Sequence, residues 1–272
     1  MNDANKNLAL RIASAVLSLP IVLFLLWHGP LATAALIAGA AGVLAFEFYT
    51  IVFRRLDPGQ MAGIAAAAFI PLAYGLRPDR FGSICAGLAM ALLIGLFAYY
   101  LIAGPLPEAP TRVSLVFTGV FYCGLLLGTV VGLRRLEHGF EWILLTLVVT
   151  WVNDTGAYAA GRGFGKHKLY PQVSPAKTWE GFAGGMTAAL VGALLTKAVY
   201  FHALSVLDCL LVALPASILG PMGDLSESML KRAYGVKDSG KIMPGHGGLL
   251  DRVDALLFTA PYVFLYALLT RG

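Results

Sequence analysis

Charge is scarce in this chain, and patterns typical of soluble or disulfide-bonded proteins are missing. Only 13% of the 272 residues are charged and 58% are hydrophobic, with a mean hydropathy of +0.75. Soluble domains carry about 25% charged residues. The three cysteines have no paired spacing, so they predict neither a disulfide framework nor a zinc site. No polar stretch is long enough to form a soluble domain, and the composition therefore predicts an integral membrane protein.

Apolar runs of about 20 residues, long enough to cross a bilayer as helices, recur along the whole chain. The predicted spans are residues 8–27, 31–53, 61–76, 82–103, 113–133, 142–160, 178–201, 204–223 and 253–269. We therefore expect an all-α integral membrane protein, a polytopic bundle of about nine transmembrane helices with a polar site facing the cytoplasm. We expect residues 1–272 to form one membrane domain, with apolar N-terminal helices in residues 1–135 and the chemistry in residues 142–272.

The basic residues predict the orientation of the chain. An N-terminus in the cytoplasm places 14 of the 20 lysine and arginine residues on the cytoplasmic side, as the positive-inside rule favours. The two large polar loops share that side, because two helices separate them. The net charge of +5 lies in short loops beside hydrophobic spans. It therefore predicts anionic headgroups or a phosphorylated substrate as partners, and not nucleic acid.

One helix face carries a carboxylate, a hydroxyl and an ammonium group. Asp224, Glu227, Ser228 and Lys231 are spaced i, i+3, i+4 and i+7, so they share a face of a helix that continues the eighth apolar run. Such a stripe suits a metal ion and a phosphate. The alternative is an interfacial helix with salt bridges between its own residues.

Two more carboxylates begin the last span. Asp251 and Asp254 stand at i and i+3, near the positive end of a helix dipole. Hard oxygen ligands in threes suit Mg²⁺, and Asp224 would complete the cluster if the last two helices are neighbours. The alternative is a helix cap with an ion pair between Asp251 and Arg252.

A glycine-rich turn precedes these carboxylates. Gly247 and Gly248 follow Pro244 closely, a combination that predicts a tight turn and close approach of backbone N–H groups to a phosphate. His246 donates to a phosphate oxygen or caps the turn. Lys237 and Arg252 add positive charge nearby, although ordinary anchoring at the membrane surface would also explain them.

The other polar loop ends in a helix-start signal. Ser174 is predicted to cap the next helix, which presents Lys177 and Thr178 where helix N–H groups attract anions. Asn153 and Asp154 end an apolar stretch, where they either contact a base or sugar or mark a helix kink. Gly181 and Gly185 form a GxxxG pattern, which predicts close helix packing.

Glu47 lies near the end of the second span. It could reach the polar site, but an interfacial ion pair with Arg54 and Arg55 is the favoured interpretation. The other four histidines, His28, His138, His167 and His202, have no spacing typical of metal ligands.

Long runs of this sequence resemble a known family. S-M-L-K-R, four residues, K-D-S-G, and then P-G-H-G-G-L-L-D-R-V-D is similar to the signature of the phosphatidate cytidylyltransferases, also called CDP-diacylglycerol synthases. S-P-A-K-T-W-E-G and D-T-G-A-Y-x-x-G-R-x-F-G-K also resemble that family. The chain departs from the pattern at Ala176, where a second lysine is frequent, and at Ala255, where a serine is frequent.

The resemblance implies transfer of a cytidylyl group from CTP to phosphatidic acid, with Mg²⁺ alone or together with K⁺. It implies metal binding by Asp224, Ser228, Asp251 and Asp254. It implies phosphate binding by Lys231, Arg232, Lys237, His246 and Arg252, with Gly247 and Gly248 in the turn. It implies contact with the nucleotide or the lipid phosphate by Asn153, Asp154, Ser174, Lys177 and Thr178. Catalysis would rest on Asp224, Lys231, Lys237, Asp251, Arg252 and Asp254.

The expected location is the bacterial inner membrane, where the protein crosses the bilayer several times among membrane lipids and could form a homodimer. Two alternatives belong to other classes. A CTP-dependent lipid kinase of the polyprenol type shares a similar nucleotide loop. An ion or phosphate transporter would carry charges deep in several spans and inverted halves, and the sequence favours neither feature.

Overall fold

The computed structural model describes residues 18–53, 55–240 and 247–271. It is an all-α membrane protein with a short β-hairpin, and eight helices in the described part are long and apolar enough to cross a membrane. Contacts within the chain divide it into two compact units. Unit 1 comprises Met1–Gly132 and Asp238–Asp251, and unit 2 comprises Leu133–Lys237 and Arg252–Gly272.

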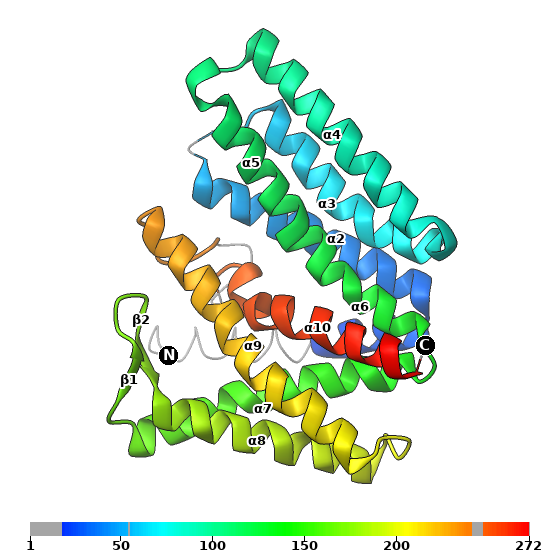
Figure 1. The fold of residues 1–272 in the computed structure, drawn as a ribbon, viewed down its shortest axis with the longest axis vertical. Coiled ribbons are helices and arrows are strands. Elements are labelled where there is room, and N and C mark those ends of the chain that lie inside the picture. The colour runs from blue at the N-terminus through cyan, green and yellow to red at the C-terminus, as the bar shows by residue number, and fades with distance from the viewer. Residues whose placement is uncertain (1–17, 54, 241–246, 272) are drawn as a thin grey trace, which may run out of the picture. The chain divides into compact units, whose positions relative to one another are not determined.

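Unit 1 consists of helices that follow one another along the chain (Figure 1). After the short helix Ser18–His28 they are α2 (Pro30–Val52), α3 (Pro58–Leu76), η1 (Pro78–Arg80), α4 (Phe81–Ala103), η2 (Leu106–Glu108), α5 (Ala109–Gly119), η3 (Val120–Leu125) and α6 (Leu126–Arg135), whose last residues belong to unit 2. The π-helical η3 joins α5 and α6 into one candidate span, Leu106–Arg135.

Small residues allow the helices of unit 1 to pack closely. A Cβ atom added to Gly124 would lie 2.7 Å from the Cα of Ala67, so the backbones of η3 and α3 touch there. The hydroxyl of Tyr49 in α2 donates to the carbonyl of Val116 in α5 at 2.6 Å, which satisfies a polar group inside an apolar core. Helix α4 differs, because only 6% of the apolar stretch in its candidate span, Pro78–Ala103, is buried. Such a surface suits contact with lipid.

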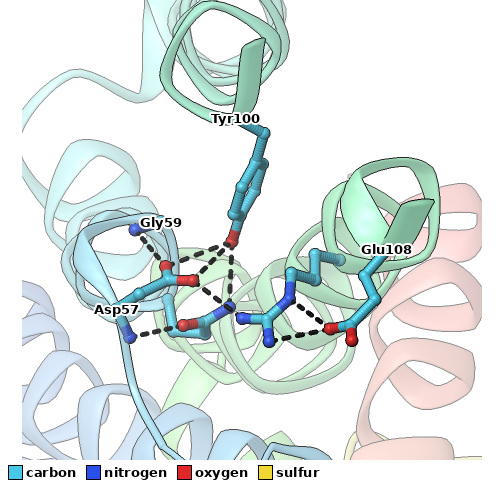
Figure 2. Close-up of polar contacts among 6 residues, drawn as sticks. Asp57, Gly59, Tyr100 and Glu108 are labelled. Atoms are coloured by element: carbon cyan, nitrogen blue, oxygen red, sulfur yellow. Dashed lines mark hydrogen bonds and ion pairs between the residues drawn. The ribbon is translucent and has the colours of Figure 1, made fainter. Parts of the chain in front are cut away.

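Helix α3 starts in a network of polar side chains (Figure 2). The carboxylate of Asp57 accepts the N–H of Gly59 at 2.7 Å and the guanidinium of Arg112 at 2.8 Å. Tyr100 donates to the same carboxylate at 3.1 Å, and Arg112 also pairs with Glu108 at 2.9 Å. The network ties α3, α4 and α5 together where the first N–H groups of α3 lack helical partners.

Unit 2 holds the remaining elements (Figure 1). They are α7 (Gly139–Phe164), β1 (Lys168–Tyr170), β2 (Ser174–Thr178), α8 (Trp179–Val199), α9 (Val206–Ala233) and most of α10 (Leu250–Arg271). Helices α7 and α8 lie side by side. A Cβ at Gly181 would come within 2.8 Å of the carbonyl of Ala157, and one at Gly185 within 2.8 Å of that of Asn153. The packing role predicted for the GxxxG pattern is confirmed.

The predicted spans agree with the observed helices. Each of the eight candidate spans corresponds to one predicted apolar run, because hydrophobic length alone determines where a helix can cross a bilayer. Of the predicted span 8–27, residues 8–17 lie outside the described residues, and its end forms the helix Ser18–His28.

The predicted cap of α8 is wrong. Ser174 does not cap a helix, because residues 174–178 form β2, which pairs antiparallel with β1. The helix begins at Trp179, and Thr178 caps it by accepting the N–H of Gly181 at 3.1 Å. The cap lies four residues later than predicted, because pairing with β1 holds residues 174–178 in an extended conformation.

Candidate active site

Two carboxylates of unit 2 lie together because the backbones of α9 and α10 touch. Gly223 packs so tightly on α10 that an added Cβ would collide with the carbonyl oxygen of Asp254. The next residue along α9 is Asp224, and its charge interacts with those of Asp254 and of Asp154 in α7. Three helices thus contribute one carboxylate each to an acidic cluster. Like charges brought together favour binding of a cation.

A lysine from the hairpin enters this cluster. Lys177, near the end of β2, places its ammonium 2.8 Å from Asp224 Oδ2 and 3.5 Å from the carbonyl of Pro221. Both side chains are partly exposed, Lys177 at 22% and Asp224 at 37%. The structure therefore joins a lysine predicted to bind phosphate to a carboxylate predicted to bind metal, although 47 positions in the sequence separate them.

Asn153 is buried beside the acidic cluster. Its side chain is 2% exposed, and its Oδ1 has no hydrogen-bond partner among the described residues. Helix α7 continues past it to Phe164, so Asn153 does not end the helix. Glycines make room for the amide on both sides, at Gly185 of α8 and Gly220 of α9. A buried amide oxygen without a partner is costly and frequently marks a functional position.

The stripe on α9 divides into two pairs. Ser228 donates to Asp224 Oδ1 at 3.3 Å, so the hydroxyl belongs to the acidic cluster. Lys231 instead pairs with Glu227 at 2.5 Å, and Glu227 is 1% exposed. The intrahelical salt bridge that the sequence offered as an alternative is therefore present for Lys231, while Asp224 and Ser228 remain with the cluster.

Asp251 belongs to unit 1 and has different neighbours. Its Oδ2 accepts the backbone N–H of Ser239 at 3.1 Å, the hydroxyl of Ser239 at 2.8 Å and the N–H of Gly248 at 3.0 Å. The Gly248 amide is thus used within the protein. Gly247 has a φ of 82°, a conformation that glycine adopts without strain.

The favoured interpretation of Glu47 is wrong. Its carboxylate is 1% exposed and accepts the backbone N–H groups of Leu249 at 3.0 Å and Leu250 at 2.8 Å. It caps α10 from inside unit 1. Arg54 lies outside the described residues, and no ion pair of Glu47 with Arg55 occurs among those described. Sequence reasoning also missed Ser239. The sequence indicated a role for Ser239 only through its position in the K-D-S-G run. It indicated a role for Glu47 because an acidic residue within an apolar run is unusual.

The remaining predicted site residues differ in their exposure. Thr178 is buried as the cap of α8, Ser174 is half-buried in β2, and Arg232, Lys237 and Arg252 are exposed. His246 lies outside the described residues. The roles of these side chains toward phosphate stay predictions.

The donors in unit 2 fit a magnesium ion. Within the described ranges, no group of three His, Cys, Asp or Glu side chains is gathered to hold an ion by itself. Mg²⁺ does not need one, because it is usually bound by one or two carboxylates together with water and substrate phosphates. Asp224 and Asp254 are hard donors of this kind. The Lys177 ammonium already lies against Asp224 as a cation would.

The contact at Gly223 predicts an effect on stability. In Gly223→Ala the new methyl group would meet the backbone of Asp254 and Ala255, and backbone cannot move aside as a flexible side chain can. We expect a loss of about 1–3 kcal/mol in stability, as for other overpacked positions, and a lower unfolding temperature in detergent. Gly163→Ala, where an added Cβ meets nothing within 4 Å, serves as the control. Equal unfolding temperatures of the two variants would contradict the close contact.

Comparison with known proteins identifies the family. Residues 9–270 match the model of the cytidylyltransferase family. The phosphatidate cytidylyltransferase of Bacillus subtilis (strain 168) is 36% identical over 265 residues, which cover 95% of this chain and 96% of the relative. That of Staphylococcus haemolyticus (strain JCSC1435) is 49% identical over 125 residues, 46% of this chain and 48% of the relative. The chain belongs to the cytidylyltransferase family.

Proposed function

We propose that the protein transfers the cytidylyl group of CTP to phosphatidate, giving CDP-diacylglycerol and diphosphate for phospholipid synthesis. The observation that carries this proposal is the ion pair of Lys177 with Asp224, beside Asp254. It joins a lysine that we propose binds phosphate to a carboxylate that we propose binds a metal, in a protein with eight candidate membrane spans among the described residues. The names of the relatives support phosphatidate as the acceptor.

The reaction requires charge neutralisation more than a strong base. An oxygen of the lipid phosphate attacks the α-phosphorus of CTP, and the bond from that phosphorus to the diphosphate breaks. The attacking phosphomonoester is already an anion at pH 7, so no side chain has to remove a proton from it. The difficulty is the approach of two polyanions, which fixed cations and a divalent metal relieve. A Ser-His-Asp arrangement would serve no purpose in this chemistry.

Each group of side chains has a proposed role. Asp224, Ser228, Asp251 and Asp254 would hold Mg²⁺, with K⁺ as a second ion. Mg²⁺, when bound, would neutralise charge on the triphosphate. Lys177 would orient a phosphate at the acidic cluster, and Asn153 would present its buried amide to the nucleotide. Exposed Arg232, Lys237 and Arg252 would guide the anionic substrates toward the site.

The site is proposed to face the cytoplasm of a bacterium from its inner membrane. The distribution of lysine and arginine supports this orientation, and CTP is a cytoplasmic metabolite. The exposed apolar surface of α4 would contact membrane lipids or a second copy of the chain.

The products of the purified protein test this proposal. In detergent, without a membrane gradient, we expect CTP and phosphatidate to give diphosphate and a lipid that carries CMP. Labelling CTP separately at the α- and γ-phosphates shows which group reaches the lipid. Transfer of only the γ-phosphate, with release of CDP, would instead identify a lipid kinase, and no consumption of CTP would favour a transporter.

A further inference from the structure

Glu47 is a buried carboxylate in the apolar part of unit 1 whose contacts lead to Asp251. It lies on α2, yet its two oxygens accept the N–H groups of Leu249 and Leu250, about two hundred residues further along the chain. These N–H groups stand at the start of α10, where no helical carbonyl is available to accept them. A carboxylate there also interacts favourably with the helix dipole. Glu47 thus determines where the first turn of α10 lies within unit 1.

Ser239 connects Glu47 to Asp251. Its hydroxyl lies 2.8 Å from Asp251 Oδ2 and 3.4 Å from Glu47 Oε2, and Ser239 is 3% exposed. Because the hydroxyl carries a single proton, it donates mainly to the nearer oxygen of Asp251. The backbone N–H of Ser239 and that of Gly248 reach the same oxygen. Three donors on one oxygen hold the Asp251 carboxylate in one orientation.

The chain around Glu47 is shaped to receive its carboxylate. A Cβ on Gly248 would collide with the hydroxyl oxygen of Ser239 and approach Glu47 Oε2 to 2.8 Å. A Cβ on Gly240 would lie 2.6 Å from Glu47 Oε1. Both glycines therefore allow the backbone to close around a buried negative group. Burial of such a group is costly unless hydrogen-bond donors surround it, so the arrangement requires Glu47 in particular.

We propose that Glu47 is a positioning residue for Asp251. It fixes the start of α10 and, with Ser239, the orientation of the Asp251 carboxylate toward a metal ion. The inference rests on the proposed function, in which Asp251 is a ligand of Mg²⁺. Substitution of a group that orients a metal ligand typically lowers metal affinity or activity by about 10- to 100-fold.

The variant Glu47→Gln tests this role with two measurements. The amide keeps the size of the side chain but presents an NH₂ group toward backbone N–H donors. We expect hydrogen exchange at Leu249 and Leu250 to become at least about tenfold faster, as the loss of a charge-assisted hydrogen bond implies. The Mg²⁺ concentration for half-maximal activity should rise by about 10- to 100-fold, while turnover at saturating Mg²⁺ stays closer to that of the wild type.

Asp57→Asn is the matched control, because Asp57 also caps a helix of unit 1 through its carboxylate (Figure 2). It should lower the unfolding temperature without changing the Mg²⁺ requirement or exchange at Leu249 and Leu250. Equal Mg²⁺ shifts in the two variants would overturn the positioning role, as would wild-type exchange or an unchanged Mg²⁺ requirement in Glu47→Gln. Failure of the proposed function is detected separately, by the products of the wild-type enzyme.

Discussion

We expect Asp251→Asn to lower the turnover rate by on the order of 10³-fold, while the protein still inserts into the membrane. A metal ligand supplies several kcal/mol of charge stabilisation in the transition state, and each 1.36 kcal/mol corresponds to a factor of ten in rate. Asparagine keeps the shape of the side chain and one oxygen but loses the negative charge. Asp251 Oδ2 accepts three hydrogen bonds, and an amide nitrogen in its place would lose all three. The rate of CDP-diacylglycerol formation, normalised to purified protein, measures the effect.

Asp238→Asn is the control for this prediction, since Asp238 is an exposed carboxylate that, like Asp251, belongs to the Asp238–Asp251 part of unit 1. It should keep a rate within about twofold of the wild type, because an exposed charge contributes little. Near-normal activity of Asp251→Asn at saturating Mg²⁺ would refute its assignment as a metal ligand. A comparable loss in both variants would point instead to the net charge of Asp238–Asp251 as a whole.

The helices could be predicted from the sequence because they depend on local hydrophobic length. The eighth run and its polar continuation are one helix, α9, so the helical spacing of Asp224 and Ser228 gave the right face. The same reasoning failed at Ser174, where pairing with β1 decides the conformation. A strand of this kind depends on a partner and not on its own residues alone.

The site was only partly predictable, because its contacts join residues far apart in the chain. The sequence marked Lys177 and Asp224 separately as polar residues beside apolar runs. It did not indicate that the ammonium of one contacts the carboxylate of the other. Glu47 was assigned to Arg54 and Arg55 since they are its nearest charges in sequence. Its observed partners are backbone N–H groups, which no pattern of side chains reveals.

Lys177→Met is expected to lower kcat/KM for CTP by on the order of 10²-fold or more. The substitution removes the ammonium at Asp224, and removal of one preorganised charged donor typically costs about 10²- to 10³-fold in rate. Methionine retains the length and apolar stem of lysine, so packing against α9 is preserved. Lys177→Arg should recover part of the activity, because it keeps the charge but changes the geometry of the donors. Initial rates at varied CTP concentrations give kcat and KM separately.

Lys168→Ala in β1 is the control, since it removes an exposed lysine from the same hairpin. Its kcat/KM should stay within about twofold of the wild type. The double variant Lys177→Met with Asp224→Asn should lose much less than the product of the two single losses, because residues that act on one another are not additive. Strict multiplication of the single effects would show that the two side chains act independently, and the ion pair would then have no part in catalysis.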